Sequence, residues 1–162
     1  MHPAQAQALA RLLDTQRTAA LGTLQGGEPF VSMVPFALLP ACTFVIHVSM
    51  LASHTANMLA EPQVSLMVAA SDTSDTAPQA LARVTIQGRA EQYRGLSIGL
   101  SAAREAYLAR FPNVAETVAM HDFFFFSVKP RSARFIAGFG QAYTLSAESL
   151  ERALANGRST AA

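Results

Sequence analysis

The order of hydrophobic and polar residues along the chain predicts strands joined by tight turns, with helices at the ends and between some strands. Residues 3–17 have apolar side chains at helical spacing, which predicts an amphipathic first helix. The mostly apolar run over 19–24 predicts a strand and residues 29–38 predict the returning strand, with a hairpin turn at 25–28. Pro35 cannot donate a backbone hydrogen bond to a neighbouring strand, so we expect an edge or a bulge there.

The stretch over residues 43–69 has the pattern of a strand, a short helix and a second strand. Residues 44–48 and 64–68 are β-branched and apolar, which predicts the two strands. Ser53 is a good N-cap, so we expect a helix over 54–59 that ends before Pro62.

The second half of the chain begins with a polar, proline-containing loop at residues 71–79. Within the strand that follows, alternation places Arg83, Thr85 and Gln87 on one face and apolar residues on the other. The run Phe123–Val128 is so apolar that both of its faces must be covered, by the core alone or by the core and a partner chain. Strands are predicted over 81–93, 123–128 and 133–137, with a turn at 129–131 and a break at 138–140. Helices are predicted over 98–111, over 114–120 and from Ser146 onward. The tail from Gly157 is expected to fray.

These elements predict a mainly β fold with flanking helices (α+β), built as a closed or split antiparallel barrel. We expect a single domain over residues 1–162. It consists of an N-terminal helix over about 1–17, a barrel over 18–143, and a C-terminal helix and tail over 144–162.

Composition narrows the classes of protein to consider. Hydrophobic residues make up 51% of the 162 residues and charged residues 14%, which favours a homo-oligomer that covers apolar surface. The net charge of +1 gives no electrostatic reason to bind nucleic acid or an anionic membrane. No apolar run approaches the roughly 20 residues of a membrane-spanning helix, and the N-terminus lacks the pattern of a signal peptide. Cys42 is the one cysteine, which excludes an intrachain disulfide, so we expect a cytoplasmic protein.

Hydroxyl groups and an imidazole gather at the predicted start of the central helix: Ser49, Ser53, His54 and Thr55. Free amides and the helix dipole make such a place suitable for an anion, although capping of the helix explains the hydroxyl groups equally well. Arg83 has the planar guanidinium group that suits phosphate or carboxylate, and its alternative role is a surface ion pair. The four histidines are scattered without metal-site spacing, and the motifs of nucleotide-binding and hydrolytic enzymes are absent, so no catalytic residue is identified.

Several segments, in this order, resemble the pyridoxamine-5′-phosphate-oxidase-like FMN-binding split barrels, and most closely their haem-utilisation (HugZ-type) branch. Together they cover most of residues 18–143. The segments are 22–24 (Gly-Thr-Leu), 32–36 (Ser-Met-Val-Pro-Phe), 47–57 (His-Val-Ser-Met-Leu-Ala-Ser-His-Thr-Ala-Asn), 61–68 (Glu-Pro-Gln-Val-Ser-Leu-Met-Val), 83–88 (Arg-Val-Thr-Ile-Gln-Gly) and 136–140 (Ile-Ala-Gly-Phe-Gly).

This resemblance implies a homodimer with two FMN sites at the interface and redox chemistry on an unidentified small molecule. The alternatives are a haem-binding protein of the HugZ type and a non-catalytic flavin-binding dimer. The residues that the resemblance assigns to the cofactor are Ser32, Met33, Val34 and Pro35 beside the flavin ring, Val48 and Ser49 lining it, Ser53, His54, Thr55 and Arg83 near the phosphate, and Phe139 and Gln141 reaching over the ring from the partner chain.

Overall fold

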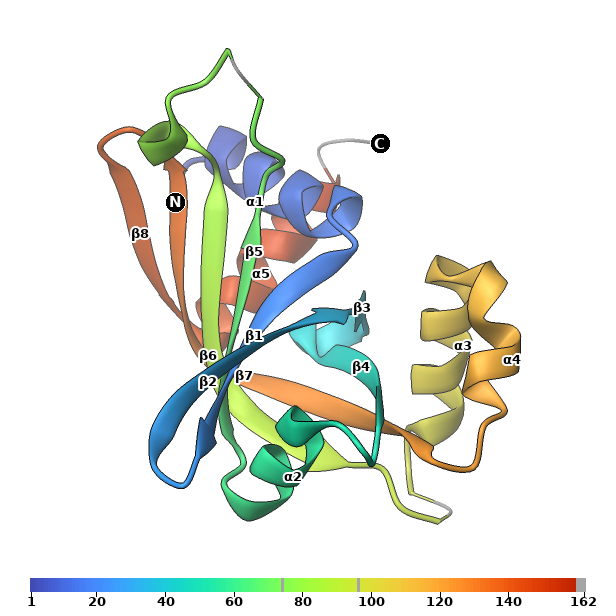
Figure 1. Cartoon of the computed structure of the whole chain (residues 1–162). Helices are drawn as coiled ribbons and strands as arrows, with labels where there is room; N and C mark the ends of the chain where they lie inside the picture. Colours follow the sequence, from blue (N-terminus) through green and yellow to red (C-terminus); the bar gives the residue numbers. More distant parts are fainter. Residues whose placement is uncertain (74, 96, 160–162) are drawn as a thin grey trace.

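The computed structural model describes residues 1–73, 75–95 and 97–159 (Figure 1). Eight strands form a single sheet, and helices pack at its ends and sides. The strands are β1 (Thr18–Gln25), β2 (Glu28–Pro35), β3 (Ala37–Leu38), β4 (Phe44–Ser49), β5 (Gln63–Ala69), β6 (Arg83–Gln92), β7 (Phe123–Gly138) and β8 (Gln141–Ser146); the helices are α1 (Pro3–Thr15), α2 (Ser53–Ala60), α3 (Leu100–Arg110), α4 (Ala115–Val118) and α5 (Ala147–Ser159).

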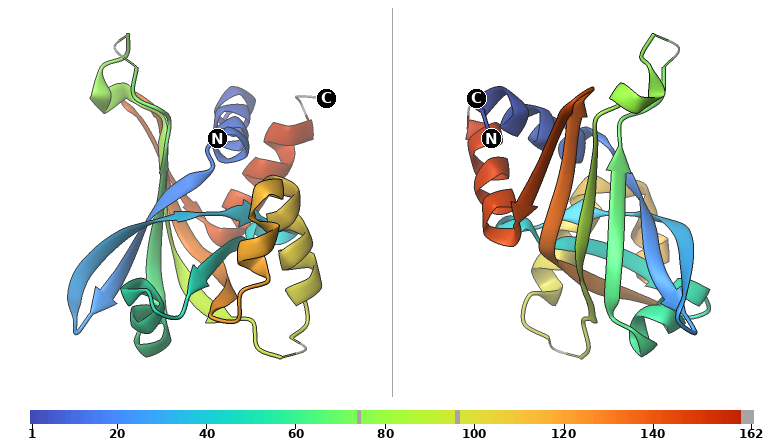
Figure 2. Two further views of the ribbon diagram at one scale, coloured as in Figure 1. Left: turned by 45° about the vertical axis from the view of Figure 1, so that its right-hand side comes forward. Right: turned by 90° about the vertical axis from the view of Figure 1, so that its left-hand side faces the viewer.

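The sheet runs in the order β2-β1-β5-β6-β7-β4-β3, and β8 pairs with β7 beside this path. Every pair of neighbouring strands is antiparallel. Figure 2 shows that the sheet curls strongly, with α1 and α5 close together at one end and α3 and α4 beside β4 and β7. This arrangement confirms the predicted fold, a mainly β split barrel with flanking helices.

Two apolar cores lie on opposite faces of β4 and β7. Ile46 of β4 and Phe126 of β7 belong to the main core inside the curl of the sheet. Val45 and Phe125 belong to a second, smaller core beneath α3. The prediction that both faces of the phenylalanine-rich strand are covered is therefore confirmed, and the cover on the second face comes from α3 of the same chain.

The predicted turn at Lys129–Arg131 is wrong, because β7 continues without interruption from Phe123 to Gly138. The strand accommodates Pro130 by a shift in the register of its pairing with β6, at the position of Gly88. A Cβ atom on Gly88 would lie 2.5 Å from the Lys129 carbonyl oxygen, so only glycine permits this close approach. A second correction is β8, a strand that follows the predicted break at residues 138–140.

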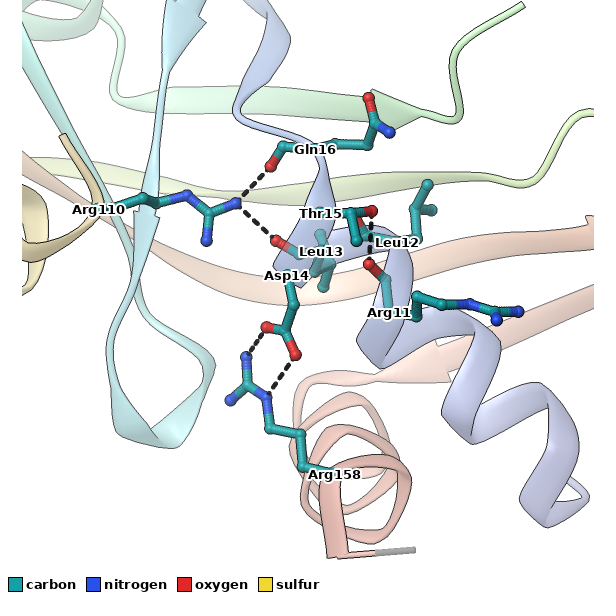
Figure 3. A network of polar contacts seen from close by, with 8 residues as sticks. All are labelled: Arg11, Leu12, Leu13, Asp14, Thr15, Gln16, Arg110 and Arg158. Carbon is teal, nitrogen blue, oxygen red and sulfur yellow. Dashed lines mark hydrogen bonds and ion pairs between the residues drawn. The ribbon is translucent and has the colours of Figure 1, made fainter. Parts of the chain in front are cut away.

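The two terminal helices pack against each other and are linked by polar contacts (Figure 3). Arg158 of α5 forms an ion pair with Asp14 of α1, with 2.6 Å between Nη2 and Oδ1. Arg110 of α3 donates to the carbonyl oxygens of Leu13 and Gln16, which end α1. These contacts hold the C-terminal end of α1 against α5 and α3.

The last helix begins as predicted, since the Ser146 hydroxyl accepts a hydrogen bond from the Ser149 amide (3.2 Å). The tail expected after Gly157 continues as α5 to Ser159, and residues 160–162 lie outside the described residues. Residue 74 of the predicted polar loop also lies outside them, as does residue 96. Within the described residues, no helix has the length and apolar character needed to cross a membrane.

Candidate functional site

The face of the sheet that points away from the main core carries exposed apolar side chains on β2 and β5. We call it the outer face. Val31 and Met33 of β2 are 68% and 66% exposed, and Met67 of β5 is 42% exposed. With Ala20 between them, they line a surface hollow of about 440 Å³. Large apolar side chains gathered on one face of a sheet indicate a surface that binds another apolar body.

Two arginines border this apolar region on the same face. Strand register places Met33 opposite Ala20, Ala20 opposite Met67, Met67 opposite Thr85, and Thr85 opposite Arg134. Arg83 lies two residues from Thr85 along β6 and therefore shares its face. The predicted alternation of this strand is confirmed.

Neither guanidinium group has a carboxylate partner among the described residues. Arg134 donates from Nη1 to the Thr144 hydroxyl (2.6 Å). Arg83 donates from Nη1 to the carbonyl oxygens of Gln79 (3.2 Å) and Leu81 (3.0 Å). The alternative of a surface ion pair for Arg83 is therefore not what the structure shows, and both groups retain the capacity to bind an anion.

The start of α2 has no side-chain cap. The predicted N-cap, Ser53, is wrong by one residue, because the N-cap is Ala52 and its side chain makes no hydrogen bond. The amides of Ser53 and His54 have no hydrogen-bond partner among the described residues. Two free amides at the positive end of a helix form a geometry that suits an anion.

The hydroxyl groups of Ser49 and Thr55 are already engaged within the chain. Ser49 Oγ donates to Asp122 Oδ2 (3.1 Å) and accepts from the Leu51 amide (3.1 Å). Thr55 is fully buried, and its Oγ1 donates to the Ser49 carbonyl oxygen (2.7 Å). These bonds hold the start of α2 against β4 and the residue before β7, so the two hydroxyl groups have a structural role.

His54 is half-buried, and its Nε2 atom is buried without a hydrogen-bond partner. Burial lowers the pKa of this imidazole from its ordinary value, so the neutral form prevails at neutral pH. His54 therefore offers an anion an N–H group and no formal charge.

Alternation divides the predicted flavin-lining residues between the two faces of β2 and β4. Met33 points to the outer face, whereas Val34 and Val48 are 1% and 3% exposed and belong to the main core. Ser32 also faces inward, opposite Leu21, and its hydroxyl is buried without a partner. Pro35 ends β2. Of this group, only Met33 presents its side chain freely to a ligand.

The predicted site residues form two groups at opposite ends of β6. Thr55 at the start of α2 contacts Ser49, which pairs with Phe123 of β7 beyond the end of β6 at Gln92, whereas Arg83 begins β6 (Figure 1). The strand from Arg83 to Gln92 is about 30 Å long. Phe139, which is 84% exposed, and Gln141 lie at the tip of the β7–β8 hairpin, on the side of Arg83. One chain therefore does not bring Arg83 to the start of α2.

Several residues of this region have no counterpart in the sequence-based predictions. Met67 and Arg134 on the outer face could have been identified from strand alternation. Asp122 and the buried Asn57, whose Nδ2 donates to the Thr23 hydroxyl (3.0 Å), act through contacts distant in sequence, so no local pattern marks them. No group of three or more potential metal ligands occurs in the described parts of the chain.

Comparisons with known proteins agree with this architecture. The sequence profile of the pyridoxamine 5′-phosphate oxidase family matches residues 5–137. The haem oxygenase HutZ of Vibrio cholerae is 30% identical over 137 residues, which cover 83% of this chain and 77% of HutZ. The non-canonical chloroplastic haem oxygenase HOZ of Arabidopsis thaliana is 34% identical over 122 residues, which cover 75% of this chain and 36% of HOZ.

Among solved structures, a haem-binding protein from Mycobacterium smegmatis superimposes with a TM-score of 0.83 at 27% identity. The match covers 94% of this chain and 62% of that protein. The chain thus spans about a third of HOZ and somewhat under two thirds of the mycobacterial protein.

Proposed function

The chain belongs to the pyridoxamine 5′-phosphate oxidase-like split-barrel family, in the branch of the HutZ-type proteins, and from this membership we propose that it binds haem. The observation that carries the proposal is the similarity to the haem oxygenase HutZ, which extends over most of both chains. The similarity to a haem-binding protein of known structure, at 27% identity, supports the same proposal. The main prediction from the sequence is an FMN-dependent oxidoreductase, with a haem-binding protein as an alternative. The proposal here adopts the haem-binding alternative.

The outer face fits the chemistry of haem. The porphyrin plane is apolar and its propionates are anionic. Val31, Met33 and Met67 supply apolar contacts, and Arg83 and Arg134 supply guanidinium groups for the propionates. When bound, the iron supplies the redox and oxygen chemistry, while the protein orients the macrocycle and restricts water.

We also propose that a second copy of the chain covers the outer face, with the ligand between the two copies. The exposed side chains of Val31, Met33 and Met67 support this arrangement, because water contact with such a group is unfavourable. The separation of Arg83 from the start of α2 supports it as well. In a dimer, the two groups of predicted site residues can come from different chains.

A titration of the purified chain with haemin, followed by absorbance, tests the proposal. The double variant Arg83→Gln/Arg134→Gln should weaken haemin about tenfold or more, since charge-assisted bonds contribute about 1.5–3 kcal/mol each when well formed. Haemin dimethyl ester, whose carboxyl groups are neutral, should bind both proteins equally. Arg11→Gln, at an exposed position of α1, is the matched control and should leave both affinities unchanged.

If the double variant binds haemin as tightly as the original protein, the propionates do not meet these arginines. The outer-face site would then be wrong even if haem binds elsewhere.

A flavin-binding protein remains the second candidate because the start of α2 is uncapped. The free amides of Ser53 and His54 suit the phosphate group of FMN. Fluorescence titrations with FMN and riboflavin distinguish this candidate, since a phosphate contact makes FMN the tighter ligand. His54→Ala should reduce that preference, and an FMN response without a haemin response would favour the flavin reading.

A further inference from the structure

A second ligand-binding cavity lies away from the outer face, between the sheet and α3. His47 of β4 points into the second core, and the residue is 7% exposed. Its ring centroid lies 4.4 Å from that of Phe125, 5.2 Å from that of Phe123 and 5.6 Å from that of Tyr107. The imidazole is thus enclosed by three aromatic rings.

One nitrogen atom of this imidazole has no hydrogen bond. Its Nε2 atom is buried, and none of the described residues provides it with a hydrogen-bond partner. An unpaired polar atom in a buried position is unfavourable, and a bound group that completes the hydrogen bond is one explanation for it.

His47 lines a cavity of about 340 Å³, which is large enough for a small ligand. Aromatic and aliphatic side chains make up most of its wall, including those of Phe123, Phe125 and Leu100. Arg94 and Arg104 stand at its exposed rim. A wall of apolar and aromatic side chains with few polar groups is the usual construction of a small-molecule site, and aromatic rings favour an aromatic ligand by stacking.

The charge of the cavity selects an anion. None of the described residues that line it carries a carboxylate. The Arg94 side chain donates from Nε to Gln92 Oε1 (3.0 Å), a neutral group, and Arg104 has no ion pair with any described residue. Burial, and then the charge of Arg104, lower the pKa of His47 to about 4, so the imidazole adds no charge at neutral pH.

We propose that this cavity binds a small aromatic carboxylic acid, with its ring against the phenylalanine wall, its carboxylate at Arg94 and Arg104, and a ring substituent within reach of His47. The aromatic rings provide the stacking surface, and the guanidinium groups provide the charge. The neutral imidazole can either donate or accept, which suits a ring hydroxyl group. This site is separate from the outer face and does not depend on haem.

Calorimetric titration of the full chain with 4-hydroxybenzoate tests the proposal, with 4-hydroxybenzamide as the uncharged analogue. The carboxylate should bind, and the amide should bind about fivefold more weakly, as expected for partly exposed charge pairs. Arg104→Gln should weaken the carboxylate to a similar extent and leave the amide unchanged. Arg11→Gln, a change of the same kind on α1, should leave both unchanged.

His47→Phe keeps the aromatic packing, fills part of the cavity and removes the nitrogen atoms, so it should abolish binding of both compounds. If 4-hydroxybenzoate gives no binding heat up to millimolar concentration, the proposal is overturned. Binding that neither Arg104→Gln nor His47→Phe alters would overturn it too, since the compound would then occupy another place. A haemin titration of Arg104→Gln should match the original protein, which separates this site from the outer face.

Discussion

Thr55→Val should destabilise the protein without affecting its ligands, because the Thr55 hydroxyl is an internal donor. Thr55 is fully buried, and its Oγ1 lies 2.7 Å from the Ser49 carbonyl oxygen. Valine replaces the hydroxyl group with a methyl group of similar size, so little cavity forms. The Ser49 carbonyl oxygen keeps its hydrogen bond from the Ala52 amide (3.2 Å), so it is not left unpaired.

The expected loss is therefore that of one neutral hydrogen bond, about 1 kcal/mol, rather than the larger penalty for an orphaned group. For a domain of this size, that loss lowers Tm by about 3 °C. Urea unfolding followed by circular dichroism measures the change in the free energy of unfolding. Titrations with haemin and FMN should give the same affinities as the original protein within about twofold.

Ser53→Ala is the matched control, since the Ser53 hydroxyl has no partner among the described residues and should change stability by less than about 0.5 kcal/mol. The reasoning is refuted if Thr55→Val leaves stability unchanged and weakens a ligand more than about tenfold. That result would assign the hydroxyl group to the ligand, as the family resemblance implies.

Three further predictions concern the fold and the second core. Arg110→Gln should lower stability by about 2 kcal/mol, because it removes charge-assisted bonds to two carbonyl groups at the end of α1; unchanged urea unfolding would contradict this. Gly88→Ala should cost about 2 kcal/mol through its clash with the backbone of β7, whereas Gly138→Ala, which meets open space, should be nearly neutral; equal effects would contradict the bulge. Between pH 6.5 and 4 the protein should lose stability as the pH falls, because unfolded His47 protonates at its ordinary pKa of 6.5 and the folded residue only at about 4. His47→Phe should reduce this loss, and an identical pH profile would contradict it.

Strand alternation carried most of the fold prediction, because a period of two reports directly on the two faces of a sheet. In β6, Arg83 and Thr85 face outward and Val84 and Ile86 are buried, as their order predicts. The proline in residues 129–131 misled the prediction of β7, because its bulge depends on a glycine in the facing strand and on pairing distant in sequence. β8 has one buried residue, Leu145, and so gives almost no hydrophobic signal.

The sequence predicts where the candidate site lies better than it predicts the role of each residue in it. The start of α2 was found from its polar residues, but the engagement of Ser49 depends on Asp122, 73 residues away. Val34 and Val48 lie in segments that resemble the family's cofactor site, yet their side chains belong to the main core. The cavity at His47 depends on α3, whose Tyr107 packs against the imidazole only in the folded chain.

The most direct test of the central proposal is a haemin titration of the purified chain followed at the Soret band. Haem held on an apolar face gives a shifted and sharpened band that saturates at a fixed haem-to-protein ratio. We predict such saturation, and sedimentation monitored at the same wavelength should place the bound haem on a species of two chains. A Soret band that stays that of free haemin, together with tight binding of FMN, would contradict the proposal and favour a flavoprotein.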